Sequence, residues 1–537
     1  MAVMLAILCC CRVALASNEY SESVGWPGTL ILVGGGEVPD EVPQRIRAVA
    51  GDDGIVVILA DAAARPLNAA ESATKWLNEQ GIQSVKTIGE VTVPEKRTEF
   101  LESLDDAKAV WICGGQQTRL VAAWEGTDLE KRLQRLLQRG GVIGGTSAGA
   151  AVMSQVMIAS GKDDPEVRRG WDLLPDAIVD QHFTQRMRIG RLQKAVSQHS
   201  GRLGLGIDED TAVVVTGRQM EIIGPGSATV VLPGCSYREE EISVLKSGER
   251  ADLTQLRRAT RHRSTACDPG QSSVGVPVVE SGALVIVGGG AMPKDIVDRF
   301  VELAGGSAAR IVVLPTAVPR EATELDVPGF LKRAEVESVV VLPQRGPSEV
   351  ESADFRQALE QATGIWFGGG RQWHFVDAYE NTRAVELFQA VLKRGGVIGG
   401  SSAGATIQGE FMVRGHPLGN TVMMAEGYER GFAFLPATAI DQHFTQRQRQ
   451  PDLLRVAFRH RGLLGLGIDE GTAVVVRGSS AEVIGLHAAH FVKVAPLQEI
   501  QDEDQLPTTV DESSRFYTTV PSGESIDLTQ FATQVTR

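Results

Sequence analysis

Two copies of one sequence pattern follow each other along this chain, and the repetition limits its possible folds more than any other feature. The segment RGGVIGGTSAGA at 139–150 recurs as RGGVIGGSSAGA at 394–405. DQHFTQRMR at 180–188 recurs as DQHFTQRQR at 441–449, and LGLGIDEDTAVVV at 203–215 recurs with one change. The copies lie about 250 residues apart, a period too long for a solenoid. The sequence therefore predicts two whole domains of the same fold.

The repeated segments also set the domain boundaries. We predict a first copy at 26–256 and a second copy at 281–537, each of single-domain length. Residues 257–280 between them are basic at first and then rich in Ser, Gly and Pro, which is typical of a linker. An acidic stretch at 499–512 has no counterpart in the first copy and predicts an inserted surface loop.

Composition excludes several classes of protein. The 53 Lys and Arg residues against 67 Asp and Glu give a net charge of −14, which argues against a nucleic-acid partner because phosphate binding needs clustered basic surface. The six cysteines have no metal-ligand spacing, so we expect no cysteine-bound metal. No segment approaches the roughly 20 uninterrupted apolar residues of a membrane span.

The first sixteen residues have the pattern of an export signal. Residues 1–16 are apolar and end in Ala14-Leu15-Ala16, as at a signal-peptidase site. Against this, no Lys or Arg precedes the apolar run and Arg12 interrupts it. The pattern predicts a signal peptide and a secreted or periplasmic protein, with a cytoplasmic protein as the alternative.

Within each copy, short β-branched runs that end in glycine alternate with helical patterns. We expect strands at 30–33, 55–59, 109–113 and 141–143, and a helix at 127–138 with its leucines on one face. Alternating strands and helices predict an α/β fold with a mostly parallel sheet covered on both sides. Ligands of such sheets bind beyond the carboxyl ends of the strands, where the glycine turns lie.

Each copy carries a G-x-S-x-G sequence directly after a predicted strand. These are Gly145 to Gly149 around Ser147, and Gly400 to Gly404 around Ser402. Small neighbours allow a sharp strand-to-helix turn that exposes the serine hydroxyl as a nucleophile. A glycine turn that serves only close packing has the same pattern, but its recurrence after the same GGVIGG strand favours a nucleophile elbow.

A serine nucleophile needs a base, usually a histidine oriented by a carboxylate. His182 and His443 match between the copies and lie in a polar D-Q-H-F cluster after a predicted strand, so they are the favoured bases. His199, matched by His460, is placed at a helix end, where it has a structural role. For the carboxylate, GLGIDE offers two adjacent acids in each copy, and spacing does not choose between them. They are Asp208 or Glu209 in the first copy and Asp469 or Glu470 in the second.

Arginines follow each candidate base and have the geometry to bind a substrate carboxylate. The first copy has Arg186, Arg188 and Arg191, although an exposed helix start would have the same composition. The second copy keeps Arg447 and Arg449 but has Asp452 in the third position. We expect this reversal of charge to alter substrate binding at the second site.

The motifs G-T/S-S-A-G-A, D-Q-H-F-x-x-R-x-R and G-I-D-E-x-T-A, in this order and in both copies, resemble cyanophycinase, within the serine peptidases that include the aspartyl dipeptidases. The resemblance implies a flavodoxin-like or class I glutamine-amidotransferase-like three-layer sandwich that forms a homodimer. It implies hydrolysis of cyanophycin, a polyaspartate whose side chains carry arginine, to β-Asp-Arg dipeptides, with no metal and no organic cofactor. Two tandem copies would then pack as a pseudo-dimer within one chain.

The resemblance also assigns roles to residues at matching positions. It implies Ser147 and Ser402 as nucleophiles, His182 and His443 as bases, and Glu209 and Glu470 as orienting acids. The implied oxyanion holes are the N–H groups of Gly115 and Ala148, and of Gly370 and Ala403. The implied substrate-binding residues are Gln117, Asp180, Gln181, Arg186, Arg188 and Arg191 in the first copy, and Gln372, Asp441, Gln442, Arg447 and Arg449 in the second.

Three other interpretations remain open from the sequence. The chain is a related peptidase or isopeptidase for other Asp-containing peptides, or it has one active and one binding-only copy. Asp452, together with Arg371 in place of Gln116, favours the second of these. A glutamine-amidotransferase-like subunit is disfavoured because that class has cysteine at the elbow, where both copies have serine.

Overall fold

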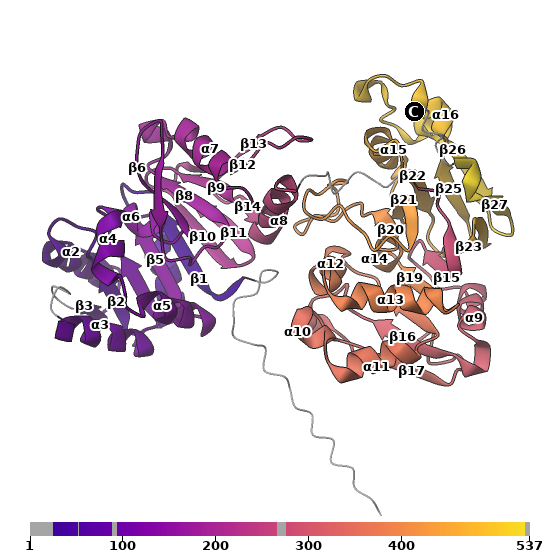
Figure 1. Ribbon diagram of the computed structural model, residues 1–537, viewed down its shortest axis with the longest axis horizontal. Coiled ribbons are helices and arrows are strands. Elements are labelled where there is room, and N and C mark those ends of the chain that lie inside the picture. The colour runs from indigo at the N-terminus through magenta and orange to yellow at the C-terminus, as the bar shows by residue number, and fades with distance from the viewer. Residues whose placement is uncertain (1–24, 52, 88–93, 266–274, 532–537) are drawn as a thin grey trace, which may run out of the picture. The chain divides into compact units, whose positions relative to one another are not determined.

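The computed structural model describes residues 25–51, 53–87, 94–265 and 275–531 (Figure 1). The chain divides into two compact units, with the division between Ser264 and Thr265. The predicted signal peptide at 1–16 lies outside the described residues. No helix in the described ranges has both the length and the apolar composition needed to cross a membrane.

The first unit, coloured indigo to magenta in Figure 1, alternates strands and helices as predicted. Its elements are β1 (Trp26–Val33), α1 (Glu41–Ala50), β2 (Val56–Leu59), α2 (Pro66–Glu79), β3 (Val85–Thr87), α3 (Pro94–Asp106), β4 (Ala109–Ile112), α4 (Gln117–Trp124), α5 (Leu129–Gln138), β5 (Val142–Thr146), α6 (Ala148–Ala151), β6 (Val156–Ser160), β7 (Glu166–Arg169), β8 (Ala177–Gln181), η1 (Thr184–Arg186), α7 (Ile189–Gln198), β9 (Leu203–Ile207), β10 (Ala212–Gly217), β11 (Gln219–Ile223), β12 (Ser227–Leu232), β13 (Glu241–Lys246), β14 (Arg250–Asp252) and α8 (Leu253–Arg263).

Two sheets form this unit. The larger has the strand order β14-β11-β10-β1-β5-β4-β2-β3, in which the strands from β1 to β3 are parallel and β10, β11 and β14 are antiparallel. The smaller has the order β13-β12-β9-β8, with β8 and β9 parallel. The parallel part confirms the predicted α/β class, and the antiparallel edge adds strands that the pattern of the sequence did not resolve.

Both faces of the large sheet are buried, which explains the continuous apolar run in β1. Ile31 and Val33 pack toward Ile46 of α1, whereas Leu30 and Leu32 pack in the core shared with α5 and the smaller sheet. The four leucines predicted on one helical face all lie buried on α5, at positions 129, 133, 136 and 137. The result is a layered sandwich with helices over the sheet.

The second unit, coloured orange to yellow, repeats this order (Figure 1). Its elements are β15 (Val279–Val287), α9 (Lys294–Leu303), η2 (Gly306–Ala308), β16 (Arg310–Leu314), η3 (Arg320–Ala322), β17 (Ser338–Val341), α10 (Pro347–Val350), α11 (Ala353–Gln361), β18 (Gly364–Phe367), α12 (Trp373–Tyr379), α13 (Arg383–Lys393), β19 (Val397–Ser401), α14 (Ala403–Thr406), β20 (Gly409–Phe411), β21 (Leu435–Gln442), α15 (Gln450–Arg459), β22 (Leu464–Ile468), β23 (Thr472–Gly478), β24 (Ser480–Gly485), β25 (Ala488–Val492), α16 (Val494–Gln498), η4 (Glu503–Gln505), α17 (Val510–Ser514), β26 (Tyr517–Pro521), β27 (Ser525–Asp527) and η5 (Leu528–Phe531).

The larger sheet of the second unit matches that of the first in connectivity, whereas the smaller sheet has an additional edge strand, β20. The larger sheet has the order β17-β16-β18-β19-β15-β23-β24-β27, and the smaller has β20-β21-β22-β25-β26. The two units differ in the insertions between these strands. The acidic stretch predicted as a loop forms the short elements η4 and α17, and it is anchored by buried Leu506 and Phe516.

The predicted linker at 257–280 overlaps regular structure at both ends. Helix α8 continues to Arg263 because Asp252 caps its first turn and Arg257 and Arg263 on its inner face are buried. At the other end, β15 begins at Val279. Regular structure therefore occupies parts of the segment that composition alone assigns to the linker.

Candidate active site

The G-x-S-x-G segment of the first unit forms the sharp turn between β5 and α6. Ser147 has φ 52° and ψ −109°, a conformation that is costly for a residue with a Cβ and that often marks functional sites. A Cβ on Gly145 would overlap the backbone of Gly149, and one on Gly149 would overlap the backbone of Ile112. Both glycines are therefore required by close backbone packing, and the turn places the serine side chain at the strand end.

The end of β1 brings this serine together with His182. The Val33 carbonyl accepts a hydrogen bond from the Ser147 N–H at 2.9 Å, and the next carbonyl, of Gly34, accepts one from the His182 N–H at 2.7 Å. Two adjacent carbonyls thus fix the backbone of both residues. The following Gly35 faces the imidazole, and a Cβ built there would overlap the ring.

A hydrogen-bonded chain links serine, histidine and glutamate. Ser147 Oγ lies 2.8 Å from His182 Nε2, and His182 Nδ1 lies 2.5 Å from Glu209 Oε1. The neighbouring Asp208 instead accepts hydrogen bonds from Thr184 N–H and from Ser227. The structure therefore distinguishes the adjacent acids: Glu209 contacts the histidine and Asp208 holds the surrounding loops.

The second unit repeats this geometry. Ser402, at φ 56°, lies 2.9 Å from His443 Nε2, and His443 Nδ1 lies 2.5 Å from Glu470 Oε1. The carbonyls of Val287 and Gly288 accept from the Ser402 and His443 N–H groups at 3.0 and 2.7 Å. Both predicted sets of three residues are therefore assembled by the same backbone contacts.

Burial keeps both histidines in the form that can accept a proton. It lowers the pKa of His182 below its ordinary value, the Glu209 hydrogen bond opposes this, and the positive charge of Arg186 adds to it. The pKa of His443 is lowered for the same reasons, with Glu470 and Arg447 in the corresponding places. At neutral pH both imidazoles are thus neutral and can act as bases.

The N–H groups expected to form the oxyanion holes are available. Within the described part of the chain, the N–H groups of Gly115, Ala148, Gly370 and Ala403 donate to no backbone carbonyl. The glycine turn lies beside the nucleophile, since a Cβ on Gly114 would come within 3.5 Å of Ser147 Cβ. Gly115 and Gly370 both have φ 145°, and their turns are anchored through the next residue's N–H to Ala62 and Ala317.

Several predicted substrate-binding residues bind one another in the first unit. Asp180 is buried and receives two hydrogen bonds from Arg191, at 2.7 and 2.5 Å, and one from Arg188 at 3.2 Å. Arg188 also binds the carbonyl and side chain of Gln181, and the third nitrogen of Arg191 donates to Gly161 O at 2.6 Å. We interpret Arg191 as holding Asp180, since all three of its guanidinium nitrogens are engaged with the protein.

Arg414 takes the place of Arg191 in the second unit. It is buried, binds both oxygens of Asp441, and contacts Asp452 at 2.8 Å. Arg449 pairs with the same Asp441 at 2.8 Å. An arginine from another segment thus pairs with Asp452, and the expected effect of Asp452 on substrate binding stays a prediction.

The remaining predicted residues divide into two groups. The side-chain amide nitrogens of Gln117 and Gln372 donate to backbone carbonyls of Ile158 and Val413, so each glutamine is oriented by the strand beyond it. Gln442 is buried and its side chain accepts from Arg449. In contrast, Arg186 and Arg447 are exposed, and their charges lie close enough to affect the histidines.

Sequence reasoning missed the residues that assemble the site. Gly34 and Gly35, with Gly288 and Gly289, recur in LVGGG and IVGGG at the end of a predicted strand, and this repetition was the available signal. Gln185 and Gln446 hold the backbone N–H of the two glutamates at 3.0 Å. No repeated sequence pattern indicated Arg414, because its counterpart in the first copy is not an arginine.

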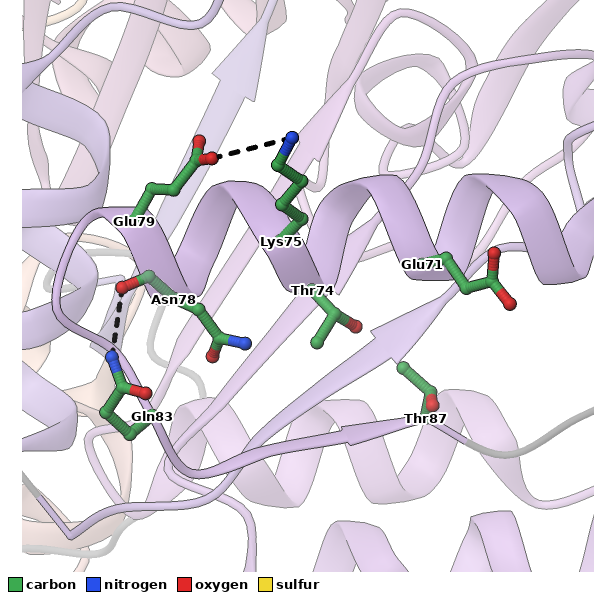
Figure 2. A pocket seen from close by; sticks show the side chains of 7 residues that line it. All are labelled: Glu71, Thr74, Lys75, Asn78, Glu79, Gln83 and Thr87. Carbon is green, nitrogen blue, oxygen red and sulfur yellow. Dashed lines mark hydrogen bonds and ion pairs between the residues drawn. The ribbon is translucent and has the colours of Figure 1, made fainter.

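A surface hollow of about 570 Å³ lies elsewhere, between α2 and β3 (Figure 2). Its rim carries an exposed pair, Lys75 and Glu79 at 3.8 Å, and Gln83 hydrogen-bonded to the carbonyl of Asn78. None of the predicted site residues lines it. We assign no function to this hollow.

An α/β sheet with a serine at a strand-to-helix turn, bonded to a histidine that is bonded to a carboxylate, defines the class of serine hydrolases. The chain belongs to Peptidase family S51, which residues 30–223 and 284–484 match as two separate segments. It is thus a serine peptidase, duplicated in tandem.

Curated relatives share about a third of their residues with this chain. The cyanophycinase of Geminocystis herdmanii is 34% identical over 217 residues, which cover 38% of this chain and 80% of the relative. The cyanophycinase of Synechococcus elongatus is 33% identical over 234 residues, covering 40% of this chain and 72% of the relative. Each of these matches spans less than half of the duplicated chain.

Solved structures are more distant. A peptidase from an acI-B1 Actinobacterium is 22% identical and covers 43% of this chain and 98% of its own, with a TM-score of 0.35. A putative peptidase E protein from Listeria monocytogenes is 18% identical and covers 38% of this chain and 99% of its own, with a TM-score of 0.30.

Proposed function

We propose that this chain is a serine exopeptidase that hydrolyses cyanophycin to β-Asp-Arg dipeptides, with both units active. The observation that carries the proposal is the serine–histidine–glutamate chain present twice, at 2.8 and 2.5 Å in one unit and at 2.9 and 2.5 Å in the other. The name of the similar proteins, cyanophycinase, supports the choice of substrate.

The proposed reaction is acyl transfer through an ester intermediate. Ser147 Oγ attacks the backbone carbonyl carbon while His182 Nε2 takes the hydroxyl proton, and the carbonyl electrons move onto oxygen. The N–H groups of Ala148 and Gly115 stabilise that oxyanion. His182 then gives its proton to the leaving amine, and a water molecule, deprotonated by the same nitrogen, releases the acyl group and restores the serine.

Glu209 supports both proton transfers through its position. Its contact with Nδ1 requires the proton on that nitrogen, which leaves Nε2 free to accept from the serine. It also stabilises the imidazolium that forms during each step. Ser402, His443 and Glu470 take the same roles in the second unit.

Substrate binding is proposed to use the charges around each site. Cyanophycin presents backbone amides, a free carboxylate at its end and arginine side chains. Arg186 and Arg447 are exposed beside the bases, and guanidinium suits a carboxylate. The oriented glutamines Gln117 and Gln372 each retain a carbonyl oxygen for a backbone N–H or guanidinium of the substrate.

The test uses full-length chains carrying Ser147→Ala, Ser402→Ala or both. Each single variant is expected to keep the activity of the other unit on insoluble cyanophycin, and the double variant to lose at least a thousandfold, with β-Asp-Arg identified by mass. Release of the dipeptide by the double variant would show that the nucleophiles are assigned wrongly. Loss of all activity in Ser147→Ala alone would show that the second unit only binds.

A second set of substrates separates the polymer from smaller peptides. Wild-type chain is offered cyanophycin, β-Asp-Arg and α-Asp dipeptides under the same conditions. The proposal requires cleavage of the polymer. Cleavage of dipeptides alone would instead identify a peptidase or isopeptidase for other Asp-containing peptides.

A further inference from the structure

The two active sites differ at one position of the glycine turn beside the nucleophile. The turn reads Gly115-Gln116-Gln117 in the first unit and Gly370-Arg371-Gln372 in the second. The backbones correspond, because the N–H of Gln116 donates to Ala62 O at 2.8 Å and that of Arg371 to Ala317 O at 2.7 Å. The two side chains therefore start from equivalent points, one residue after the glycine proposed to bind the oxyanion.

Arg371 is a half-buried cation without a carboxylate. Its Nη2 donates to the carbonyls of His416 and Gly419 at 2.6 and 2.7 Å, its Nε is buried without a hydrogen bond, and Nη1 has no partner among the described residues. Burial lowers the pKa of Arg371, and no acidic side chain acts against this. Gln116 in the first unit is exposed to solvent.

The other cations of the two sites correspond to one another. Asp441 pairs with Arg414 and Arg449, as Asp180 pairs with Arg191 and Arg188, and Asp452 pairs with Arg414 in addition. Arg447 remains as the exposed counterpart of Arg186. Arg371 adds one positive charge to the second site and Asp452 adds one negative charge, so the two groups of charged residues carry the same formal charge. The second site differs in having a half-buried cation, Arg371, without a carboxylate partner.

The segment that receives Arg371 also differs between the units. Gly170 N–H bonds to Gln155 O, and Gly431 N–H bonds to Glu410 O, so these pairs mark equivalent ends. The segment between them is six residues longer in the second unit, and it replaces the β6–β7 hairpin with a loop that Arg371 and Arg414 hold through backbone carbonyls. These hydrogen bonds fix the guanidinium of Arg371 against the loop after β20.

We propose that Arg371 binds the free C-terminal carboxylate of the substrate, so that the second unit prefers short Asp-containing peptides in which this carboxylate lies close to the scissile bond. The first unit, with Gln116, has no such preference. The proposal rests on the proposed function, since it assigns a substrate class to the second of the two peptidase sites. A desolvated guanidinium forms stronger hydrogen bonds to a carboxylate than to a neutral amide, which gives the preference its physical basis.

The experiment isolates the second site in the Ser147→Ala chain and compares two substrates, α-Asp-Leu and its C-terminal amide. Arg371→Gln, which installs the residue of the first unit, is expected to raise KM for the free acid about 10- to 100-fold and to leave the amide within twofold. The matched control is Gln116→Ala in the Ser402→Ala chain, where the ratio of the two substrates should not change.

Equal losses on both substrates would overturn the proposal, because they would show that Arg371 serves only to hold the loop. An unchanged KM for the acid would overturn it as well. If the Ser147→Ala chain hydrolyses neither peptide, the proposed activity of the second unit is wrong. The role of Arg371 is then tested by calorimetry, which measures the binding of the two peptides to the Ser147→Ala/Ser402→Ala chain. In that case Arg371→Gln must weaken binding of the acid and not of the amide, and any other result contradicts the role of Arg371.

Discussion

Both the nucleophile and the base of each unit have left-handed backbones. Ser147 and His182 have φ of 52° and 49°, and Ser402 and His443 have 56° and 51°. Such conformations cost about 1–3 kcal/mol each and persist only where surrounding contacts enforce them. Here the enforcing contacts are the paired carbonyls at the ends of β1 and β15, so the strain and the hydrogen bonds that hold it are part of one arrangement.

A substitution at Gly35 tests how closely the position of the His182 imidazole depends on this arrangement. In Gly35→Ala the new methyl would overlap the His182 ring, and φ 114° is unfavourable for alanine. Displacement of the ring by about 1 Å is expected to lower kcat/KM of the first site about a hundredfold, measured in the Ser402→Ala chain. Gly289→Ala should have the same effect on the second site only.

Gly190 provides the matched control for Gly35. It lies in α7, where a Cβ would meet no atom within 4 Å. Gly190→Ala should leave kcat/KM unchanged and stabilise the helix slightly. A Gly35→Ala chain with wild-type kinetics would contradict the packing described for the base.

The lowered pKa of His182 predicts how the rate depends on pH. Protonation removes the base, so kcat/KM of the first site should fall as the pH falls through this pKa, and the fall should lie below pH 6.5. Arg186→Gln removes one positive charge that disfavours the imidazolium, so the acid limb should move to higher pH. Profiles are measured in the Ser402→Ala chain.

Arg477→Gln is the control for this shift, since Arg477 is exposed on β23 of the other unit. It should leave the acid limb in place. If the acid limb of the Arg186→Gln variant stays in place or moves to lower pH, the charge of Arg186 does not act on the base. If Arg186 also binds substrate, KM rises in addition to the shift.

At the scale of elements, the two units pair an equivalent buried aspartate with arginines from different elements. Asp180 ends β8 and is paired from α7, whereas Asp441 ends β21 and is paired by Arg414 from the loop after β20. An uncompensated carboxylate at either place would be strongly destabilising. The second unit, which has Asp452 where the first has Arg191, therefore needs the arginine that the loop after β20 supplies.

Arg414→Ala and Asp452→Ala separate the two partners of this contact. Removing Arg414 leaves Asp441 buried with Arg449 alone, and we expect a loss of about 3 kcal/mol in the unfolding of the second unit. Removing Asp452, whose side chain is 46% exposed, should cost less than about 1 kcal/mol. Denaturant unfolding followed by circular dichroism measures both, and similar losses would contradict the assignment of Arg414 as the required partner.

The elements and the reacting groups could be predicted from the sequence, but the contacts between distant segments could not. The run LILVGGG predicts β1 and a turn, and G-x-S-x-G predicts the elbow, because these patterns are local. The choice between Asp208 and Glu209 depends on which carboxylate the turn after β9 directs at His182, and adjacent positions carry no signal for this. Arg414 depends on the path of a longer loop, which pairs it with an aspartate 27 residues away.

At the scale of the whole molecule, the sequence of residues 1–16 leads to a prediction about export. If residues 1–16 are a signal peptide, the protein exported from a bacterial host should begin at Ser17, as determined by N-terminal sequencing. Replacing Ala14 and Ala16 by bulky residues should block the cleavage. An intracellular protein that retains Met1 would support the cytoplasmic alternative.

The tandem arrangement finally predicts a self-contained assembly. We propose, from the resemblance to a family of homodimers, that the two units pack on each other within one chain, so that no second chain is needed. Solution scattering should then give a monomer of 57.5 kDa with a radius of gyration near 24 Å, the value for a compact chain of this length. Two separated lobes would give a clearly larger radius and a second maximum in the distance distribution, whereas a mass of two chains would show that each unit pairs with another molecule instead.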